Sequence, residues 1–288
     1  MDDRMNIQWY PGHMTKTRRQ IEADLKLVDA VCEIVDARIP VSSRNPDIDA
    51  ICGDKPRMIV LNRMDLADPA ATRKWAEYFR RKGMAVIATD CKSKKGISAF
   101  TPAARLACAE KLERDAKRGM NRPLRVMVVG IPNVGKSTLI NQISGRKSAK
   151  AENRPGVTRG KQWVTVDSGL QLLDTPGILW PKFEDPEVGM MLAYTGAVKE
   201  GVIDLEELAY RLMELLHKFY PQTLLERYKV EAPEGTPGWQ LLEMAGRKRG
   251  YLVSGGEVNT ERMAKVLLDE FRSGKLGNFT LELPEDMV

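Results

Sequence analysis

Eight residues, Gly130 to Ser137, carry the clearest chemical pattern in the chain. They read GIPNVGKS and fit the spacing G-x-x-x-x-G-K-[ST], with an apolar stretch before them and a helical pattern after them. Glycines let backbone N–H groups approach phosphate oxygens, Lys136 can reach β- and γ-phosphates, and the Ser137 hydroxyl can bind Mg²⁺. We therefore predict a phosphate-binding loop for a nucleoside triphosphate. Its other expected nucleotide contacts are Asn133, Val134, Gly135 and Thr138.

A second pattern, LLDTPG from Leu172 to Gly177, places an acid at the end of an apolar run. In enzymes with such loops an Asp at this place holds Mg²⁺, so Asp174 is the candidate, and the Gly177 N–H could donate to the γ-phosphate. Thr158, between the two patterns, is the candidate that covers Mg²⁺ and senses the γ-phosphate. Thr165 is a weaker alternative, because it falls within an expected strand.

These parts predict a triphosphatase without identifying the base. An acid that accepts from the N1–H and 2-amino group of guanine would select against adenine, and Ras-like GTPases supply it in N-K-x-D downstream of the phosphate loop. Nothing after Gly177 fits. Upstream, Asn62-Arg63-Met64-Asp65 fits, and Asp90-Cys91 stands where a backbone N–H would reach guanine O6. The order of parts is therefore a circular permutation, which is tolerated when natural termini lie close together at the surface.

The elements that must position these residues follow from hydrophobic patterning. Apolar runs at 30–36, 57–62, 84–90 and 124–130 predict buried strands, helical patterns at 69–83, 96–119 and 136–144 separate or follow them, and 161–174 predicts a hairpin. Strands alternating with helices predict an α/β fold with a doubly wound, mostly parallel sheet. Beyond Pro181 the pattern is mostly helical. We predict a permuted GTPase domain over 1–180 and a helical domain over 181–288.

Composition limits the class of protein. No run of 18 apolar residues occurs in the 288, so no membrane span is expected, and the start lacks a signal or transit pattern. The chain has four widely separated cysteines, Cys32, Cys52, Cys91 and Cys108. They predict buried or incidental thiols in a reducing cytoplasm, with neither a zinc site nor a disulfide frame. A net charge of +6 favours an anionic partner such as RNA, although ordinary charge variation accounts for it equally well.

With this order of motifs, the chain resembles the circularly permuted ribosome-assembly GTPases of the YlqF or ribosome biogenesis GTPase A family. The segments that carry the resemblance, beside the motifs above, are IQWYPGHMTK, DARIPVSSRNP, PGILWPKFED and KRGYLVSGGEVN. The resemblance covers nearly the whole chain. It implies a GTPase domain and a small helical RNA-binding domain, acting late on the precursor of the large ribosomal subunit, with rRNA as partner and a monomer off the ribosome. Arg63 departs from the usual Lys of the base reader.

Hydrolysis needs a group that orients the attacking water, and the residues directly after the Leu172–Gly177 pattern lack one. Ras-like enzymes orient water with a Gln just after the Asp-x-x-Gly pattern, whereas this chain has Ile178 there. We therefore expect low intrinsic GTPase activity, stimulated by K⁺ and ribosomal particles. Asn133 is a candidate K⁺ ligand, and His13, after a Pro-Gly turn, is a candidate for handling a proton or water. RNA contact or a purely structural role are the alternatives for His13.

Two basic segments are candidate RNA contacts. The first segment, DARIPVSSRNP, contains Arg38 and Arg44, although it could also be a solvated loop without an RNA contact. The second segment contains a cluster that chance could also produce, namely Arg247, Lys248, Arg249 and Tyr251. Three functions therefore compete: a GTP-hydrolysing assembly factor, an ATPase or nucleotide kinase, and a binding module with vestigial hydrolysis. Asn62 and Asp65 disfavour the second and Ile178 gives some weight to the third. We favour the first, with GTP, GDP, Mg²⁺ and K⁺ as cofactors.

Overall fold

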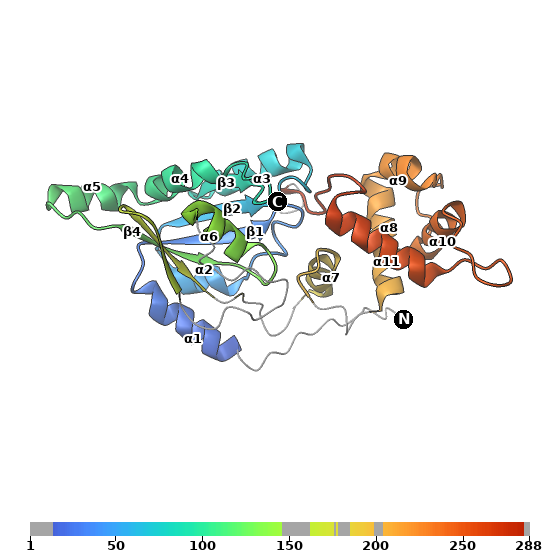
Figure 1. Cartoon of the computed structure of the whole chain (residues 1–288), viewed down its shortest axis with the longest axis horizontal. Coiled ribbons are helices and arrows are strands. Elements are labelled where there is room, and N and C mark those ends of the chain that lie inside the picture. Colours follow the sequence, from blue (N-terminus) through green and yellow to red (C-terminus); the bar gives the residue numbers. More distant parts are fainter. Residues whose placement is uncertain (1–13, 146–161, 176, 178–184, 199–203, 285–288) are drawn as a thin grey trace. The chain divides into compact units, whose positions relative to one another are not determined.

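The computed structural model describes residues 14–145, 162–175, 177, 185–198 and 204–284 (Figure 1). The described residues up to Gly177, together with those from Glu282 onward, form one compact unit, called here the sheet unit. Those from Asp185 to Leu281 form a second, the helical unit. The sequence boundary near residue 180 placed everything after it in the helical domain. The structure differs at the end of the chain, where Glu282 lies with the sheet unit.

The sheet unit is built on a six-stranded sheet in the order β3-β2-β1-β4-β6-β5. All neighbouring strands run parallel except β5 and β6, which form the predicted hairpin. The strands are β1 Ala30–Asp36, β2 Arg57–Asn62, β3 Ala85–Thr89, β4 Leu124–Val129, β5 Gln162–Asp167 and β6 Leu170–Asp174. The predicted α/β class and all six strands are thus confirmed. Because the parallel strands end at one edge, the residues that follow them meet there.

Helices cover both faces of this sheet. They are α1 Met14–Leu25, α2 Asp47–Cys52, α3 Pro69–Arg81, α4 Phe100–Ala107, α5 Ala109–Lys117 and α6 Lys136–Ser144. The predictions for α3 and α6 are confirmed, whereas α1 and α2 were not foreseen. The single helix expected over 96–119 is wrong: a 3₁₀ turn at Ile97–Ala99 leads into α4, and non-helical backbone at Cys108 (φ −109°, ψ 18°) separates α4 from α5.

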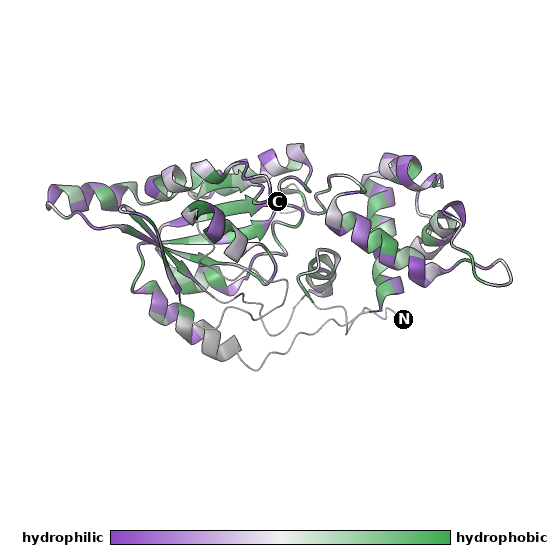
Figure 2. Cartoon of the chain, viewed as in Figure 1, coloured by the Kyte–Doolittle hydropathy of each residue, from purple (hydrophilic) through white to green (hydrophobic). Residues whose placement is uncertain are grey.

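The core of the sheet unit follows from the alternation of side chains along each strand. On one face, Val31 and Met127 pack with Ile21 of α1 and Ile48 of α2, and farther along the same face Val35 packs with Trp75 of α3. The parallel strands are therefore mostly apolar, although β1 also carries the buried Glu33 and Asp36. Polar residues gather on the outer sides of the helices (Figure 2). All four cysteines are free and buried, as predicted.

The helical unit confirms the helical pattern expected beyond Pro181. Its described helices are α7 Pro186–Tyr194, α8 Leu205–Phe219, α9 Pro221–Tyr228, α10 Gly238–Lys248 and α11 Thr260–Ser273. The longest, α8, packs against the other four, and a Cβ at Gly238 would lie 2.0 Å from the Tyr210 carbonyl oxygen. A glycine therefore lets α10 approach α8 closely. Among the described helices, none is long and apolar enough to cross a membrane.

Glu282 fixes the end of the described chain to the sheet unit. Its carboxylate accepts hydrogen bonds from the Val41 N–H at 2.6 Å and the Ser42 N–H at 3.0 Å, and also from the Ser42 hydroxyl. Its carbonyl oxygen accepts from the Trp75 indole N–H at 2.8 Å. The chain therefore leaves the sheet unit after β6 and returns to it at Glu282, so the helical unit is joined to the sheet unit at both ends.

We expect the Glu282 contact to be stronger in acid than at neutral pH. Burial raises the pKa of this carboxyl to about 6, from a usual value of 4.5, although hydrogen bonds from Ser42 and Val41 oppose the rise. The unfolded chain therefore loses the proton first, and the contribution to stability falls as pH rises from about 4.5 to 6. The free-energy difference between the wild type and Glu282→Gln, measured by urea unfolding, should change by roughly 2 kcal/mol between pH 4.5 and 7.5.

An exposed carboxylate of the helical unit serves as the control. Glu234→Gln should leave the pH profile of urea unfolding as it is in the wild type. A Glu282→Gln profile parallel to that of the wild type would contradict the assignment.

Candidate nucleotide-binding site

The predicted phosphate loop leads from β4 into α6. A Cβ at Gly130 would lie 2.6 Å from the Ile34 carbonyl oxygen, so only glycine lets the loop pass this close to β1. Gly135 precedes α6 in a left-handed conformation (φ 105°), and Lys136 is the first residue of the helix. The first backbone N–H groups of a helix have no partner within it, and the dipole there favours an anion. The loop thus has the geometry of a phosphate site.

Asn62 joins this loop to the base-reading turn. Its Nδ2 donates to the Val134 carbonyl oxygen at 2.7 Å, and its Oδ1 accepts from the Thr89 hydroxyl at 3.0 Å and the Cys91 thiol at 3.1 Å. A Cβ at Gly135 would lie 2.4 Å from Nδ2. Two features therefore require glycine at position 135, namely its positive φ and the close approach of the Asn62 amide. One buried amide side chain holds three segments in register.

The rest of the Asn62–Asp65 motif forms a turn over the phosphate loop. Arg63 takes a left-handed conformation (φ 61°), and its Nη2 donates to the Asn133 carbonyl oxygen at 2.5 Å. The Met64 N–H donates to the Thr89 carbonyl oxygen at 3.1 Å, and Asp65 is exposed beside it. The turn therefore presents the Asp65 carboxylate at the surface, while its neighbours fix the backbone.

The candidate base loop is braced from within. The Asp90 N–H donates to the Lys95 carbonyl oxygen at 3.0 Å, and the Asp90 carboxylate accepts from the Lys92 N–H at 2.8 Å. Two of the three N–H groups at the tip are thus used inside the loop, which leaves that of Cys91 as the candidate for guanine O6. Burial raises the pKa of the Cys91 thiol to about 11, so it stays neutral as a donor to Asn62.

Asp174 ends β6 directly beside the phosphate loop, in register with Val128 of β4. The residue is fully buried, and neither carboxylate oxygen has a hydrogen-bond partner among the described residues. Burial raises its pKa, and the nearby Lys136 opposes that rise. A buried carboxylate without such partners is costly. An arriving divalent cation would remove this cost, so the residues present fit the Mg²⁺ that phosphate loops recruit.

Lys136 carries the matching cost. It is buried, its Nζ lies 3.4 Å from the Gly130 carbonyl oxygen, and burial lowers its pKa to about 8 although Asp174 opposes the shift. Gly177 lies against the same group, since a Cβ there would be 3.2 Å from Nζ and 2.9 Å from the Pro132 Cα. Ser137 and Thr138, partly buried, occupy the first turn of α6 beside Lys136. Lys136, Asp174 and Gly177 are therefore brought together as the sequence predicted.

Two predicted residues, His13 and Thr158, lie outside the described part of the chain, as does Ile178. Three of the basic candidates are engaged internally. Arg38 is fully buried and bonded to Asp36, which takes it out of reach of RNA in this conformation. Arg44 pairs with Glu33 at 2.9 Å, and Arg249 lies 3.3 Å from Glu270.

The remaining basic candidates lie around the end of α10. Arg247 and Lys248 are exposed, with Arg247 paired to Glu243 one helical turn earlier. Tyr251 is partly buried, and the Arg262 guanidinium stacks over its ring at 4.3 Å. RNA contact by this segment therefore stays a prediction, and it rests mainly on the exposed Lys248.

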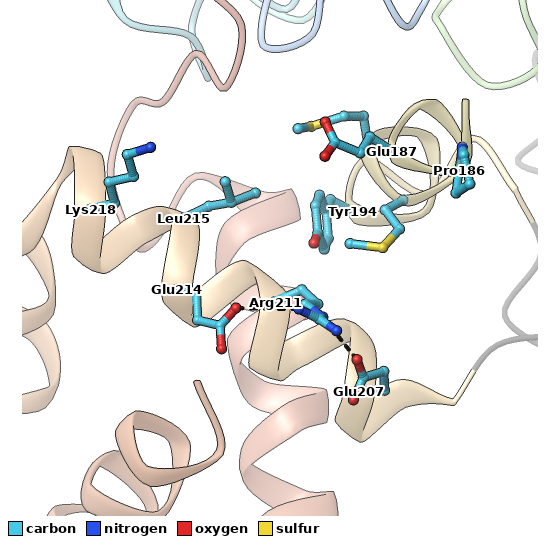
Figure 3. A pocket seen from close by; sticks show the side chains of 10 residues that line it. Pro186, Glu187, Tyr194, Glu207, Arg211, Glu214, Leu215 and Lys218 are labelled. Atoms are coloured by element: carbon cyan, nitrogen blue, oxygen red, sulfur yellow. Dashed lines mark hydrogen bonds and ion pairs between the residues drawn. The ribbon is translucent and has the colours of Figure 1, made fainter. Parts of the chain in front are cut away.

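A separate cavity lies between α7 and α8 of the helical unit (Figure 3). It has a volume of about 440 Å³ and an apolar wall of methionines and Leu215. Arg211 on its rim is paired with Glu207 at 2.9 Å, and the buried Tyr194 hydroxyl has no hydrogen-bond partner among the described residues. In the ranges that the structure covers, no group of three or more His, Cys, Asp or Glu side chains could hold a metal ion among themselves.

Sequence reasoning missed Asp36 and Thr89 as parts of the site. Thr89 bonds Asn62, and Asp36 lies 3.3 Å from an Arg63 guanidinium nitrogen. A signal for Asp36 was present, because an acid that ends an apolar strand at the carboxyl edge of a parallel sheet stands where ligands bind.

Affinity for a phosphate-bearing ligand should fall above about pH 8. Bound phosphate favours protonated Lys136, so binding takes up a proton once the free lysine is neutral. The affinity for GDP should be flat from pH 6.5 to 7.5 and then weaken by up to about tenfold per unit above pH 8. Fluorescence titration measures it. Guanosine, with the same base and no phosphate, is the control, and an equal fall for guanosine would refute the role of Lys136.

Comparisons with known proteins agree with this geometry. A family model described as 50S ribosome-binding GTPase matches residues 125–222, a range that begins in β4 and includes the phosphate loop. The turn at Asn62–Asp65 precedes that match, as a permuted order requires. A GDP-bound YlqF structure matches with a TM-score of 0.68 and 29% identity, over 93% of this chain and 100% of that one.

Two further matches extend over nearly the full length. A GNP-bound YlqF structure from T. maritima has a TM-score of 0.62 and 28% identity, covering 94% of this chain and 99% of that one. Ribosome biogenesis GTPase A of Priestia megaterium is 46% identical over 285 residues, 98% of each chain. With an identity this high over nearly the whole length, the chain belongs to the ribosome biogenesis GTPase A family, the circularly permuted GTPases that its order of motifs resembled.

Proposed function

We propose that this chain hydrolyses GTP to GDP and phosphate as a late assembly factor of the large ribosomal subunit. The observation that carries the proposal is the Asn62 contact with Val134, which joins a guanine-reading turn to a phosphate loop. Membership of a GTPase family supports the reaction, and the names of its relatives support a ribosomal role. An ATPase would have no use for Asp65 at this place.

The residues of the site divide the work of binding. The N-terminus of α6 and Lys136 hold the β- and γ-phosphates, while Asp65 accepts from the guanine N1–H and 2-amino group. Ser137, Asp174 and Thr158 would hold Mg²⁺, which neutralises charge on the phosphates when bound. Gly177 donates its N–H to the γ-phosphate, so its position depends on whether GTP or GDP is bound.

Charge stabilisation in the transition state falls to other groups, because Ile178 offers no polar atom. Asn133 of the phosphate loop is our candidate K⁺ ligand, through its side-chain amide oxygen. His13 is the candidate that positions water or moves a proton. The exposed Lys248 and Arg247 would contact rRNA, and the net charge of +6 supports an RNA partner. We also expect the protein to be cytoplasmic, which action on ribosomal precursors would support, and to be a monomer when off the ribosome.

Base selection provides a direct test. Asp65→Asn should weaken GTP binding by about tenfold or more and improve XTP binding, because the amide can donate to the 2-carbonyl of xanthine while it no longer accepts from guanine. Competition of GTP, XTP and ATP against a fluorescent nucleotide measures the change. Asp68→Asn is the control, since Asp68 caps α3. An unchanged preference for GTP in Asp65→Asn would remove Asp65 from the base site.

Turnover should depend on two additions, K⁺ and large ribosomal subunits. GTP hydrolysis is measured with K⁺ or Na⁺, each with and without subunits, in the wild type and in Asn133→Ala. We expect each addition to raise the wild-type rate and Asn133→Ala to lose only the response to K⁺. If added subunits do not change the rate of GTP hydrolysis, a binding module with vestigial hydrolysis is favoured. Equal rates of hydrolysis in K⁺ and Na⁺ would contradict the role of Asn133 as a K⁺ ligand.

A further inference from the structure

We propose that Asp36 is a positioning residue of the nucleotide site, which holds the Arg63 guanidinium on the Asn133 carbonyl oxygen and so fixes the phosphate loop beneath the base-reading turn. The proposal concerns binding and hydrolysis of guanine nucleotide. It does not depend on the K⁺ role suggested for Asn133.

The order of strands gives Asp36 its place. β1 lies between β2, whose end carries the base-reading turn, and β4, whose end begins the phosphate loop. Asp36 is the last residue of β1 and lies in register with Asn62. A side chain at the end of the middle strand can reach both halves of the site, which the chain itself joins only through some 70 intervening residues.

The Asp36 carboxylate is held rigidly. Its Oδ1 accepts from the Arg38 N–H and Nε, each at 3.0 Å, and its Oδ2 accepts from Arg38 Nη2 at 2.8 Å. Asp36 is 2% exposed and Arg38 is fully buried. Burial alone would raise the pKa of Asp36, but Arg38 above all, and then Arg63, hold it below its usual value, so the group is a carboxylate at neutral pH. Its own backbone segment therefore fixes this charge in place.

Arg63 bridges from that fixed charge to the phosphate loop. Its Nη1 lies 3.3 Å from Asp36 Oδ2, and its Nη2 donates to the Asn133 carbonyl oxygen at 2.5 Å. The guanidinium is a planar fork, so orienting one nitrogen orients the other. A lysine at this position would offer a single ammonium to both partners. The acid on β1 thus acts together with the Arg that distinguishes this chain from the usual base reader.

The contact bears on the reaction through the backbone of Asn133. This residue has a positive φ of 59°, a left-handed conformation that is uncommon for non-glycine residues and that asparagine adopts more readily than most. Arg63 binds the carbonyl oxygen of this left-handed residue and so helps to fix the orientation of the peptide that follows it. Without the orienting carboxylate, we expect this peptide to move more freely and the phosphates to be bound less tightly.

A double-mutant cycle distinguishes this role from support of the fold through Arg38. GDP release is followed with a fluorescent analogue in full-length wild type, Asp36→Asn, Arg63→Gln and the double variant. Each single variant should release GDP about tenfold faster, as for loss of a charged hydrogen bond. The double variant should be no faster than either single one, because both act through one contact. Rates that multiply in the double variant would overturn the proposal.

Glu33→Gln is the matched control. Glu33 also lies on β1, is 1% exposed and binds two arginines, Arg44 and Arg57. Its replacement should lower the free energy of unfolding without changing GDP release. If Glu33→Gln accelerates release as much as Asp36→Asn does, the effect is a general weakening of the sheet unit and the proposal fails.

A second variant covers the case in which Asp36→Asn does not fold. Asp36→Glu keeps the charge beside Arg38 and moves the carboxylate by one methylene group. It should speed GDP release several-fold with Arg63 present and leave release unchanged in the Arg63→Gln background. The same acceleration in both backgrounds would show that Asp36 does not act through Arg63.

Discussion

The close contact between Asn62 and the phosphate loop is the constraint on which the nucleotide site depends. A guanine nucleotide has its base at one end and its phosphates at the other, so the two readers must lie at a fixed separation. In this chain they are far apart in sequence and lie on strands that are not neighbours. The Asn62 amide donates to the Val134 carbonyl oxygen, and it can do so because Gly135 has no Cβ to obstruct it. This contact sets the separation of the two readers, whichever of them comes first in the sequence.

Buried charge is the second property that shapes the site. Lys136 and Asp174 lie in the same apolar surroundings, and burial opposes the charged form of each. Their mutual attraction repays only part of the cost of removing two ions from water. A polyanion and a divalent cation arriving together would give both groups a partner. The desolvation cost that Lys136 and Asp174 carry in the free protein would then be relieved, which favours binding. Asp36 is different, since Arg38 already satisfies it, and such a group can orient others without titrating.

Much of this arrangement could be predicted from local pattern. Long apolar runs predicted the strands to within one residue at each end, because strands buried on both faces leave few alternatives. The phosphate loop and Asn62–Asp65 were found because their chemistry needs fixed spacing. What failed depends on contacts between distant residues. Arg38 was taken as a surface cation, yet its partner is a buried acid two residues earlier. Likewise, α4 and α5 form one continuous helical pattern, and nothing in that pattern indicates the break at Cys108.

The return of the chain at Glu282 gives the helical unit two covalent connections to the sheet unit. A single linker would leave the end of the chain to find its site from solution, whereas here the tail is held near Val41 and Ser42 at a high effective concentration. A few hydrogen bonds then suffice to keep it bound, although they would not hold a free peptide. The helical unit is in effect a long insertion in the sheet unit, and the hydrogen bonds of Glu282 hold its far end in place. If those hydrogen bonds broke, the helical unit would become an appended domain without the loss of any covalent bond.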